Sequence, residues 1–104
     1  MTSRIVLEPK NAAETVSIVF DFASQLTGSE TVSSATVTAA VYSGSDSSPS
    51  SVISGSATAS GTKVTQKVTA GTLGVTYVLT CTAVTSTSQT LTMIGYLVII
   101  PATQ

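Results

Sequence analysis

Apolar residues recur at every second position through much of this chain, and that alternation limits its fold more than any other feature. One segment carries the apolar residues Val16, Ile18, Phe20 and Phe22, and a second carries Ala35, Val37, Ala39 and Val41. Side chains two positions apart share one face of a β-strand. No stretch shows apolar residues at the helical period of 3.6 over three turns. The sequence therefore predicts strands joined by turns, without helices.

Serine and threonine make up roughly a third of the 104 residues, a composition found in disordered chains as well as in β proteins. Disordered chains lack regularly spaced β-branched and aromatic residues, whereas here Val, Ile and Leu recur in every segment outside the loops. The length fits a single domain over residues 1–104, with a modest core and a thin margin of stability.

Turn signals divide the chain into six or seven short strands. After the two segments above, strands are expected over residues 56–60, 63–68, 75–84 and 91–100. The N-terminal arm, residues 1–14, adds a possible strand at 5–7. The serine-rich segment 43–51 is expected to be a mobile surface loop that folding does not need. This count without helices predicts an all-β protein, an immunoglobulin-like antiparallel β-sandwich of about seven strands.

Tyr77 stands at the start of the penultimate strand, directly after Gly74, Val75 and Thr76. A tyrosine here either folds its hydroxyl back onto the preceding turn, as in the tyrosine corner of immunoglobulin-like sandwiches, or is an ordinary half-buried strand residue. The predicted core consists of inward-facing residues from several strands: Ile18, Phe20, Val37, Val41, Tyr77, Leu79, Cys81 and Leu97.

The sequence lacks the side chains on which most enzymes depend. It has no histidine, so Ser–His and Cys–His pairs cannot form, and its single cysteine, Cys81, has no disulfide or zinc partner. Asp21 and Glu30 bracket the first crossing between strands, where solvated carboxylates or turn caps are a simpler interpretation than a catalytic pair. Asp46 among serines is too isolated to indicate a calcium site. We therefore expect no catalytic residue, no cofactor and no metal.

Charge argues against nucleic acid as a partner, and the length of the apolar segments argues against a membrane-spanning helix. The basic residues are Arg4, Lys10, Lys63 and Lys67 and the net charge is −1, so no basic stripe can bind nucleic-acid phosphates. Lys63 and Lys67 share one face of a strand, where a solvated face is a simpler role than contact with a small anion. The most apolar run, residues 91–100, is too short to span a membrane as a helix, which needs about 20 residues.

The last predicted strand is apolar on both faces, although a sandwich strand needs only one apolar face. Leu91, Met93, Leu97 and Ile99 share the face expected to point inward. The other face is the candidate assembly interface: Ile94, Tyr96, Val98 and Ile100. Soluble monomers seldom expose such a patch. We expect it to contact a neighbouring subunit, unless the N-terminal residues 5–7 or a loop cover it.

Two neighbouring strings in the sequence are similar to a known family. Asp21–Leu26 (DFASQL) and Gly28–Ala35 (GSETVSSA) resemble a DFA–L–GETI–SA signature of small virion proteins of tailed bacteriophages, the fibre–tail adaptors. Val41–Asp46 and Gly74–Thr82 fit the same pattern, so the resemblance extends over about residues 15–100. Ser29 separates the expected Gly-Glu pair, which lengthens the crossing by one residue.

The resemblance implies a non-enzymatic structural component of a virion, an adaptor that attaches tail fibres to the tail or neck. Its implied partners are tail, neck or fibre subunits and further copies of itself, in a particle assembled in the cytoplasm of the bacterial host. A head-decoration (cement) protein of the capsid is the alternative. A carbohydrate-binding module fits less well, because the sequence has no tryptophan and only Tyr42 and Tyr96 as expected exposed rings.

Overall fold

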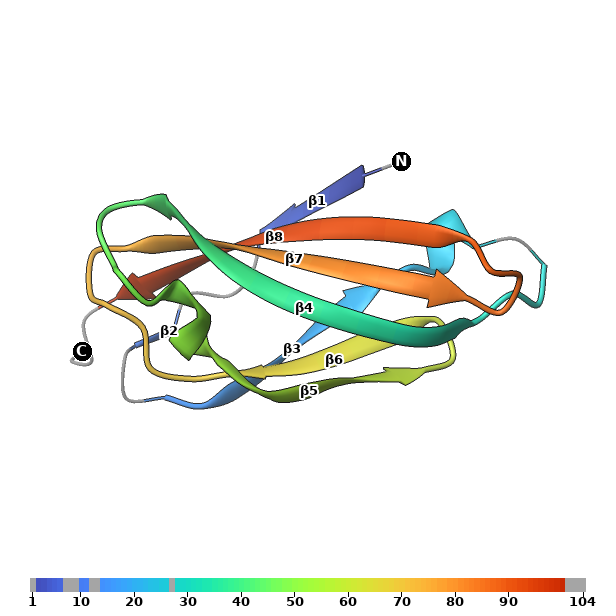
Figure 1. Cartoon of the computed structure of the whole chain (residues 1–104), viewed down its shortest axis with the longest axis horizontal. Coiled ribbons are helices and arrows are strands. Elements are labelled where there is room, and N and C mark those ends of the chain that lie inside the picture. The colour runs from blue at the N-terminus through green and yellow to red at the C-terminus, as the bar shows by residue number, and fades with distance from the viewer. Residues whose placement is uncertain (1, 7–9, 12–13, 27, 101–104) are drawn as a thin grey trace.

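Two β-sheets pack face to face in the computed structural model, which describes residues 2–6, 10–11, 14–26 and 28–100 (Figure 1). One sheet consists of β4 (Val32–Ser43), β7 (Thr76–Thr85) and β8 (Thr90–Ile100), with β1 (Thr2–Val6) and β2 (Lys10–Asn11) beside β8. The other consists of β3 (Val16–Asp21), β6 (Lys63–Val68) and β5 (Ile53–Ser60). Two short 3₁₀ helices, η1 (Ala23–Gln25) and η2 (Pro49–Val52), lie in the connections.

The strand order identifies the type of sandwich. The strands run β1-β8-β7-β4 in one sheet and β3-β6-β5 in the other, so the chain passes between the sheets after β2, β3, β4 and β6. With the N-terminal strands set aside, this is the distribution of the second to seventh strands of an immunoglobulin domain, in which the second, fourth and fifth strands share one sheet. The prediction of an all-β, immunoglobulin-like sandwich is confirmed.

The pairing differs from the expected antiparallel pattern beside β8. β3, β5 and β6 pair antiparallel, as do β4, β7 and β8, whereas β1 and β2 run parallel to β8. Two parallel neighbouring strands need a long connection in the chain. Here the chain that connects β1 to β8 forms most of the domain. The strand predicted at residues 5–7 is found as β1. Residues 1, 7–9 and 12–13 of the predicted arm lie outside the described residues.

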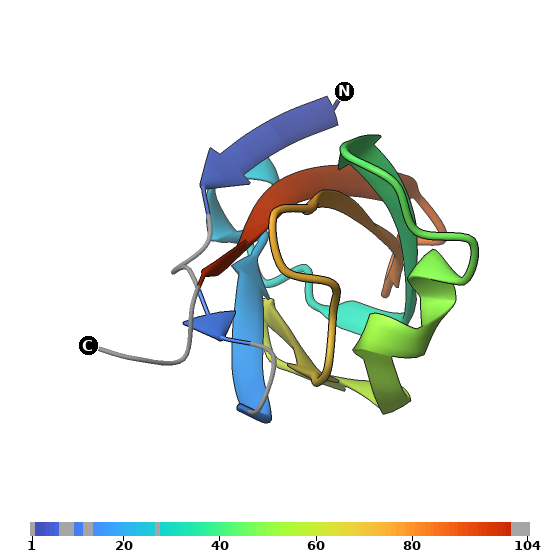
Figure 2. The ribbon, with the colours of Figure 1, turned by 90° about the vertical axis from the view of Figure 1, so that its left-hand side faces the viewer.

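The core fills the space between the two inner faces, which Figure 2 shows end-on. Side chains without exposed surface come from both sheets and include Phe20, Phe22, Val64, Val68, Tyr77, Leu79, Cys81 and Leu97. Six of the eight predicted core residues are buried, whereas Val37 and Val41 are half-buried and pack against the core. Both belong to β4, the edge strand of its sheet, which pairs with β7 on one side only.

Gln66 is a polar residue in this core, only 1% exposed. The β5–β6 register shifts between Ser54 and Thr58, so that residues 55–57 of β5 oppose Gln66 alone. The side-chain amide nitrogen of Gln66 lies 3.1, 3.2 and 2.8 Å from the backbone carbonyl oxygens of Ser54, Gly55 and Lys67. The amide thereby satisfies carbonyl groups at the bulge, and these bonds explain why a polar side chain is buried here.

The Tyr77 hydroxyl folds back onto the turn before β7, so of the two roles considered for Tyr77 the structure shows the tyrosine corner. It accepts the backbone N–H of Thr72 at 2.8 Å and donates to Asp46 Oδ2 at 2.5 Å. The other carboxylate oxygen of Asp46 accepts the N–H of Ser48 at 2.9 Å. The segment 43–51, predicted as a mobile loop, is thus anchored to the corner at Asp46, and it leads into η2, whose last residue, Val52, is fully buried.

Truncation of Phe20 tests the register of β3. Phe20 has no exposed surface, whereas its neighbour Val19 is 46% exposed. Phe20→Ala is expected to lower the free energy of unfolding by about 3–5 kcal/mol, and the matched Val19→Ala by less than about 1 kcal/mol. Urea denaturation measures both. A larger effect of Val19→Ala than of Phe20→Ala would show that β3 turns its other face to the core.

Removal of the Tyr77 hydroxyl tests the corner. Tyr77→Phe keeps the buried ring but leaves the Thr72 N–H and the Asp46 carboxylate without this partner. A loss of about 1–3 kcal/mol in the free energy of unfolding is expected near neutral pH. Thr80→Ser, which also removes one small group from β7 but lies outside the corner, serves as the control.

The same variant has an expected dependence on pH. Hydrogen bonds from the Tyr77 hydroxyl and the Ser48 N–H hold the pKa of Asp46 below its ordinary value of 3.8. A carboxyl whose pKa is lowered on folding stabilises the folded state fully above the unfolded value, and that contribution is lost as the pH falls through the folded value. The stability difference between wild type and Tyr77→Phe should therefore be constant down to about pH 5 and shrink below about pH 4. An undiminished difference at the acid end would exclude Asp46 as the partner that matters.

Candidate functional site

The second apolar face of β8 lies on the outside of the sandwich. Leu97 has no exposed surface, whereas the next residue, Val98, is 39% exposed and Ile100 is 41% exposed. The other two residues of the candidate interface, Ile94 and Tyr96, are half-buried on the same side of the strand. The division of β8 into an inward and an outward apolar face is therefore present in the structure.

A contact between two tyrosine rings extends the outer apolar face from β8 across β7 to β4. The rings of Tyr42 and Tyr96 lie 4.7 Å apart between centroids, at an interplanar angle of 58°. Tyr42 belongs to β4, on the far side of β7 from β8, and is 65% exposed. The β4–β7 register shifts between Val41 and Ser43, at Tyr42 itself. Both rings were expected to be exposed, but nothing in their spacing predicts that they touch.

Val78 of β7 lies between the strands that carry the two tyrosines. It pairs in register with Ala40 of β4 on one side and with Tyr96 of β8 on the other. We define the apolar face as the outward residues that these three strands bring together: Tyr42, Val78, Ile94, Tyr96, Val98 and Ile100. Threonines occupy neighbouring outward positions of β4 and β7, among them Thr38 and Thr80, which pair with each other.

The three strands under the apolar face contain no charged residue. Apart from two sulfur-containing side chains, hydroxyl groups are their only polar side-chain groups. The centres of protein–protein interfaces are depleted of charged residues and enriched in tyrosine. Burial of these three strands against a partner would therefore remove none of their own side-chain charges from water, and removal of an unpaired charge from water is very costly.

The N-terminal strand does not lie over the apolar face. Ile5 pairs with Gly95 and Val6 with Tyr96, so β1 extends the sheet sideways at β8 (Figure 1). A strand added in the plane of a sheet leaves the outer face of its neighbour uncovered. The expected alternative, in which residues 5–7 cover this face, does not hold for Ile5 and Val6, and Leu7 lies outside the described residues.

The two carboxylates that bracket the first crossing have separate structural roles. Asp21 accepts the backbone N–H of Ala23 at 2.9 Å and the hydroxyl of Thr62 at 3.3 Å, and so caps the turn after β3 as expected. Glu30 is 7% exposed and accepts the hydroxyl of Thr87 from the β7–β8 turn, so it is buried instead of solvated. Both side chains are therefore engaged in holding turns.

Cys81 is a core residue without accessible thiol chemistry. It is fully buried, and burial raises the pKa of its thiol to about 12. The thiolate, which is the reactive form, is then negligible at neutral pH. Within the described ranges, no three His, Cys, Asp or Glu side chains come together as a possible metal site. No helix there is both long and apolar enough to cross a membrane.

A model of a known protein family matches most of the chain. The family is described as podophage GP4 fiber-tail adaptor protein gp77, and the match covers residues 10–94. This range includes the strands from β2 to β7 and the first part of β8. No curated protein matches the chain. The resemblance found in the sequence is confirmed.

Proposed function

Because the chain belongs to the podophage GP4 fiber-tail adaptor family, we propose that it is a non-enzymatic connector that attaches tail fibres to the tail or neck of a bacteriophage. A structural protein of this family is part of the virion and contacts other virion proteins. The proposal adds that it self-associates or binds the tail protein, that it binds neither nucleic acid nor membrane, and that it joins the particle in the host cytoplasm.

The apolar face is the observation that carries this proposal. It unites two tyrosines and four aliphatic side chains on three neighbouring strands, β4, β7 and β8, that have no charge. Large aromatic residues surrounded by uncharged neighbours are typical of the residues that dominate binding energy in interfaces. In the assembled particle this face packs against a tail subunit or against a second copy of the chain.

Attachment to the capsid, as a decoration protein, is the competing role. The fold alone supports either role, because function resides in surfaces grafted on a common sandwich. The family description names fibre and tail, and that description favours the adaptor role. A low-resolution map of the particle distinguishes the two roles by whether the domain lies at the tail or on the head.

Charge introduced at two adjacent positions of β8 tests the apolar face. Val98→Lys places an ammonium on the outward side, so the free protein should stay folded but be lost from particles, because a partner would have to bury the charge. Leu97→Lys buries the same charge in the core and should unfold the protein. Circular dichroism reports folding, and quantitative mass spectrometry of purified particles reports copy number.

A third lysine provides the matched control. Leu73 is 59% exposed in the β6–β7 connection and is not one of the six residues that define the apolar face, so Leu73→Lys should enter particles at the wild-type copy number. If Val98→Lys also reaches that copy number, the apolar face does not hold the protein in the particle.

A further inference from the structure

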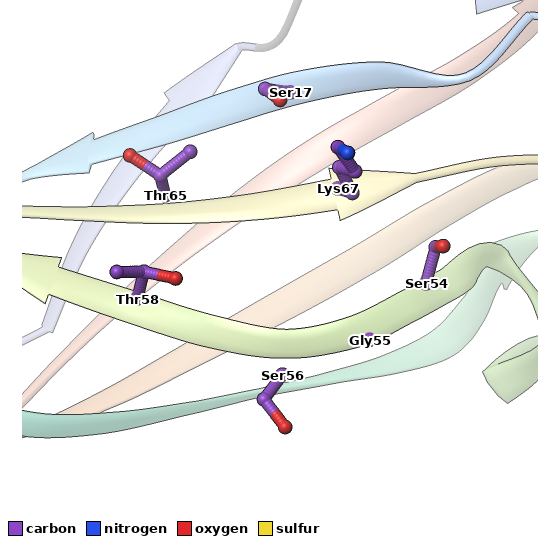
Figure 3. A pocket seen from close by; sticks show the side chains of 7 residues that line it. All are labelled: Ser17, Ser54, Gly55, Ser56, Thr58, Thr65 and Lys67. Carbon is purple, nitrogen blue, oxygen red and sulfur yellow. The ribbon is translucent and has the colours of Figure 1, made fainter.

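The outer surface of the β3-β6-β5 sheet carries a groove with a chemistry opposite to that of the apolar face. The groove is open and has a volume of about 270 Å³. Five hydroxyl side chains and one ammonium line it: Ser17, Ser54, Ser56, Thr58, Thr65 and Lys67. Figure 3 shows that these residues come from all three strands of the sheet. No aromatic ring lines the groove, so it lacks the stacking platform that a sugar site usually offers.

Strand register and the β5 bulge produce the groove. Lys67 of β6 pairs with Ser17 of β3 on one side and with Ser54 of β5 on the other. The lysine is therefore flanked by two small residues that carry hydroxyl groups. Gly55 follows in the bulge with φ of 74° and has no heavy atom within 4 Å of its Cβ position. The small residues and the glycine leave space there. The buried side-chain amide of Gln66 stabilises the bulge by donating to the carbonyl oxygen of Gly55.

The two lysines of β6 differ in their electrostatic surroundings. Lys63 pairs in register with Asp21, a carboxylate on the same face of the sheet. Lys67 has no acid among its register partners, and none lines the groove around it. The ammonium of Lys67 and the hydroxyl groups of its register partners Ser17 and Ser54 are hydrogen-bond donors, which a carboxylate accepts. The groove is therefore complementary to an anionic side chain.

We propose that this groove binds an aspartate or glutamate side chain of the fibre subunit, while the apolar face binds the tail. The inference rests on the proposed adaptor function, which requires two partners at once. The groove and the apolar face lie on different sheets, on the two outer surfaces of the sandwich, so neither partner obstructs the other. Charge selects the occupant: among the described residues that line the groove the one charged side chain is the ammonium of Lys67, whereas the strands under the apolar face carry no charge.

Matched substitutions of the two lysines test the groove in assembled particles. Lys67→Gln removes the charge in the groove and Lys63→Gln removes the charge opposite Asp21; both side chains are exposed, so both variants should stay folded. Adaptor copies and fibre copies per particle are measured separately. Lys67→Gln particles should keep the adaptor, and fibre binding should weaken by about tenfold, with a larger loss for Lys67→Glu. Lys63→Gln particles should keep both proteins.

Two results would contradict the proposal that the groove binds an acidic side chain of the fibre subunit. One is a normal fibre content on Lys67→Glu particles, and the other is an equal loss of fibres for the two glutamine variants. A third result would also contradict the proposal: the Lys67→Glu protein folds, but the adaptor itself is missing from the particles. This result would show that the groove binds the tail. Failure of the adaptor function is seen separately, as a particle map that places the domain on the head instead of the tail.

Discussion

The hydroxyl of Tyr77 is buried at the point where the chain enters β7, and its two hydrogen bonds join segments that are far apart in the sequence. They connect the turn at Thr72 to Asp46 in the β4–β5 connection. A buried hydroxyl without partners is unfavourable, so this site determines where β7 begins. β7 pairs with both β4 and β8, and its start therefore sets the register of three strands. A shift by one residue would turn Leu79 outward and Val78 inward.

That register also decides what the outer surface of the sheet offers to a partner. An antiparallel sheet with one buried face usually carries polar and charged side chains on the other. Here the outward positions of β4, β7 and β8 hold threonine, tyrosine, valine and isoleucine, and the charges lie on other elements. Threonine suits a strand as valine does, and its hydroxyl remains compatible with water. The sheet is thus stable before a partner binds and loses little hydration of charge when one does.

Local periodicity is enough to predict the strands, the sandwich and the two apolar faces of β8, because each follows from a spacing of two residues. The tyrosine corner is predictable for the same reason, since it depends on a turn next to Tyr77. Its partner Asp46 is not, because 31 residues separate the two and an anchoring aspartate looks like a solvated one in a serine-rich segment. The contact between Tyr42 and Tyr96 depends on which distant strands become neighbours. Alternation places Gln66 inward, but the carbonyl groups that it satisfies exist only after β5 has bulged.

The difference between the two outer surfaces follows from how each sheet uses its polar residues. The β3-β6-β5 sheet contains the three-residue bulge, the buried amide, Lys63 and Lys67, so its outer surface is hollowed and polar, whereas the outer surface formed by β4, β7 and β8 is uncharged and largely apolar. Sheets in a sandwich pack about 10 Å apart, and this domain measures 20 Å across its shorter axes. Partners on the two surfaces are thus separated by little more than the two sheets. Phe20 and Leu97, which lie without exposed surface between them, belong to a close-packed interior that transmits strain instead of yielding. In the proposed role, tension on a fibre reaches the tail through that interior, with no flexible linker between the two binding surfaces.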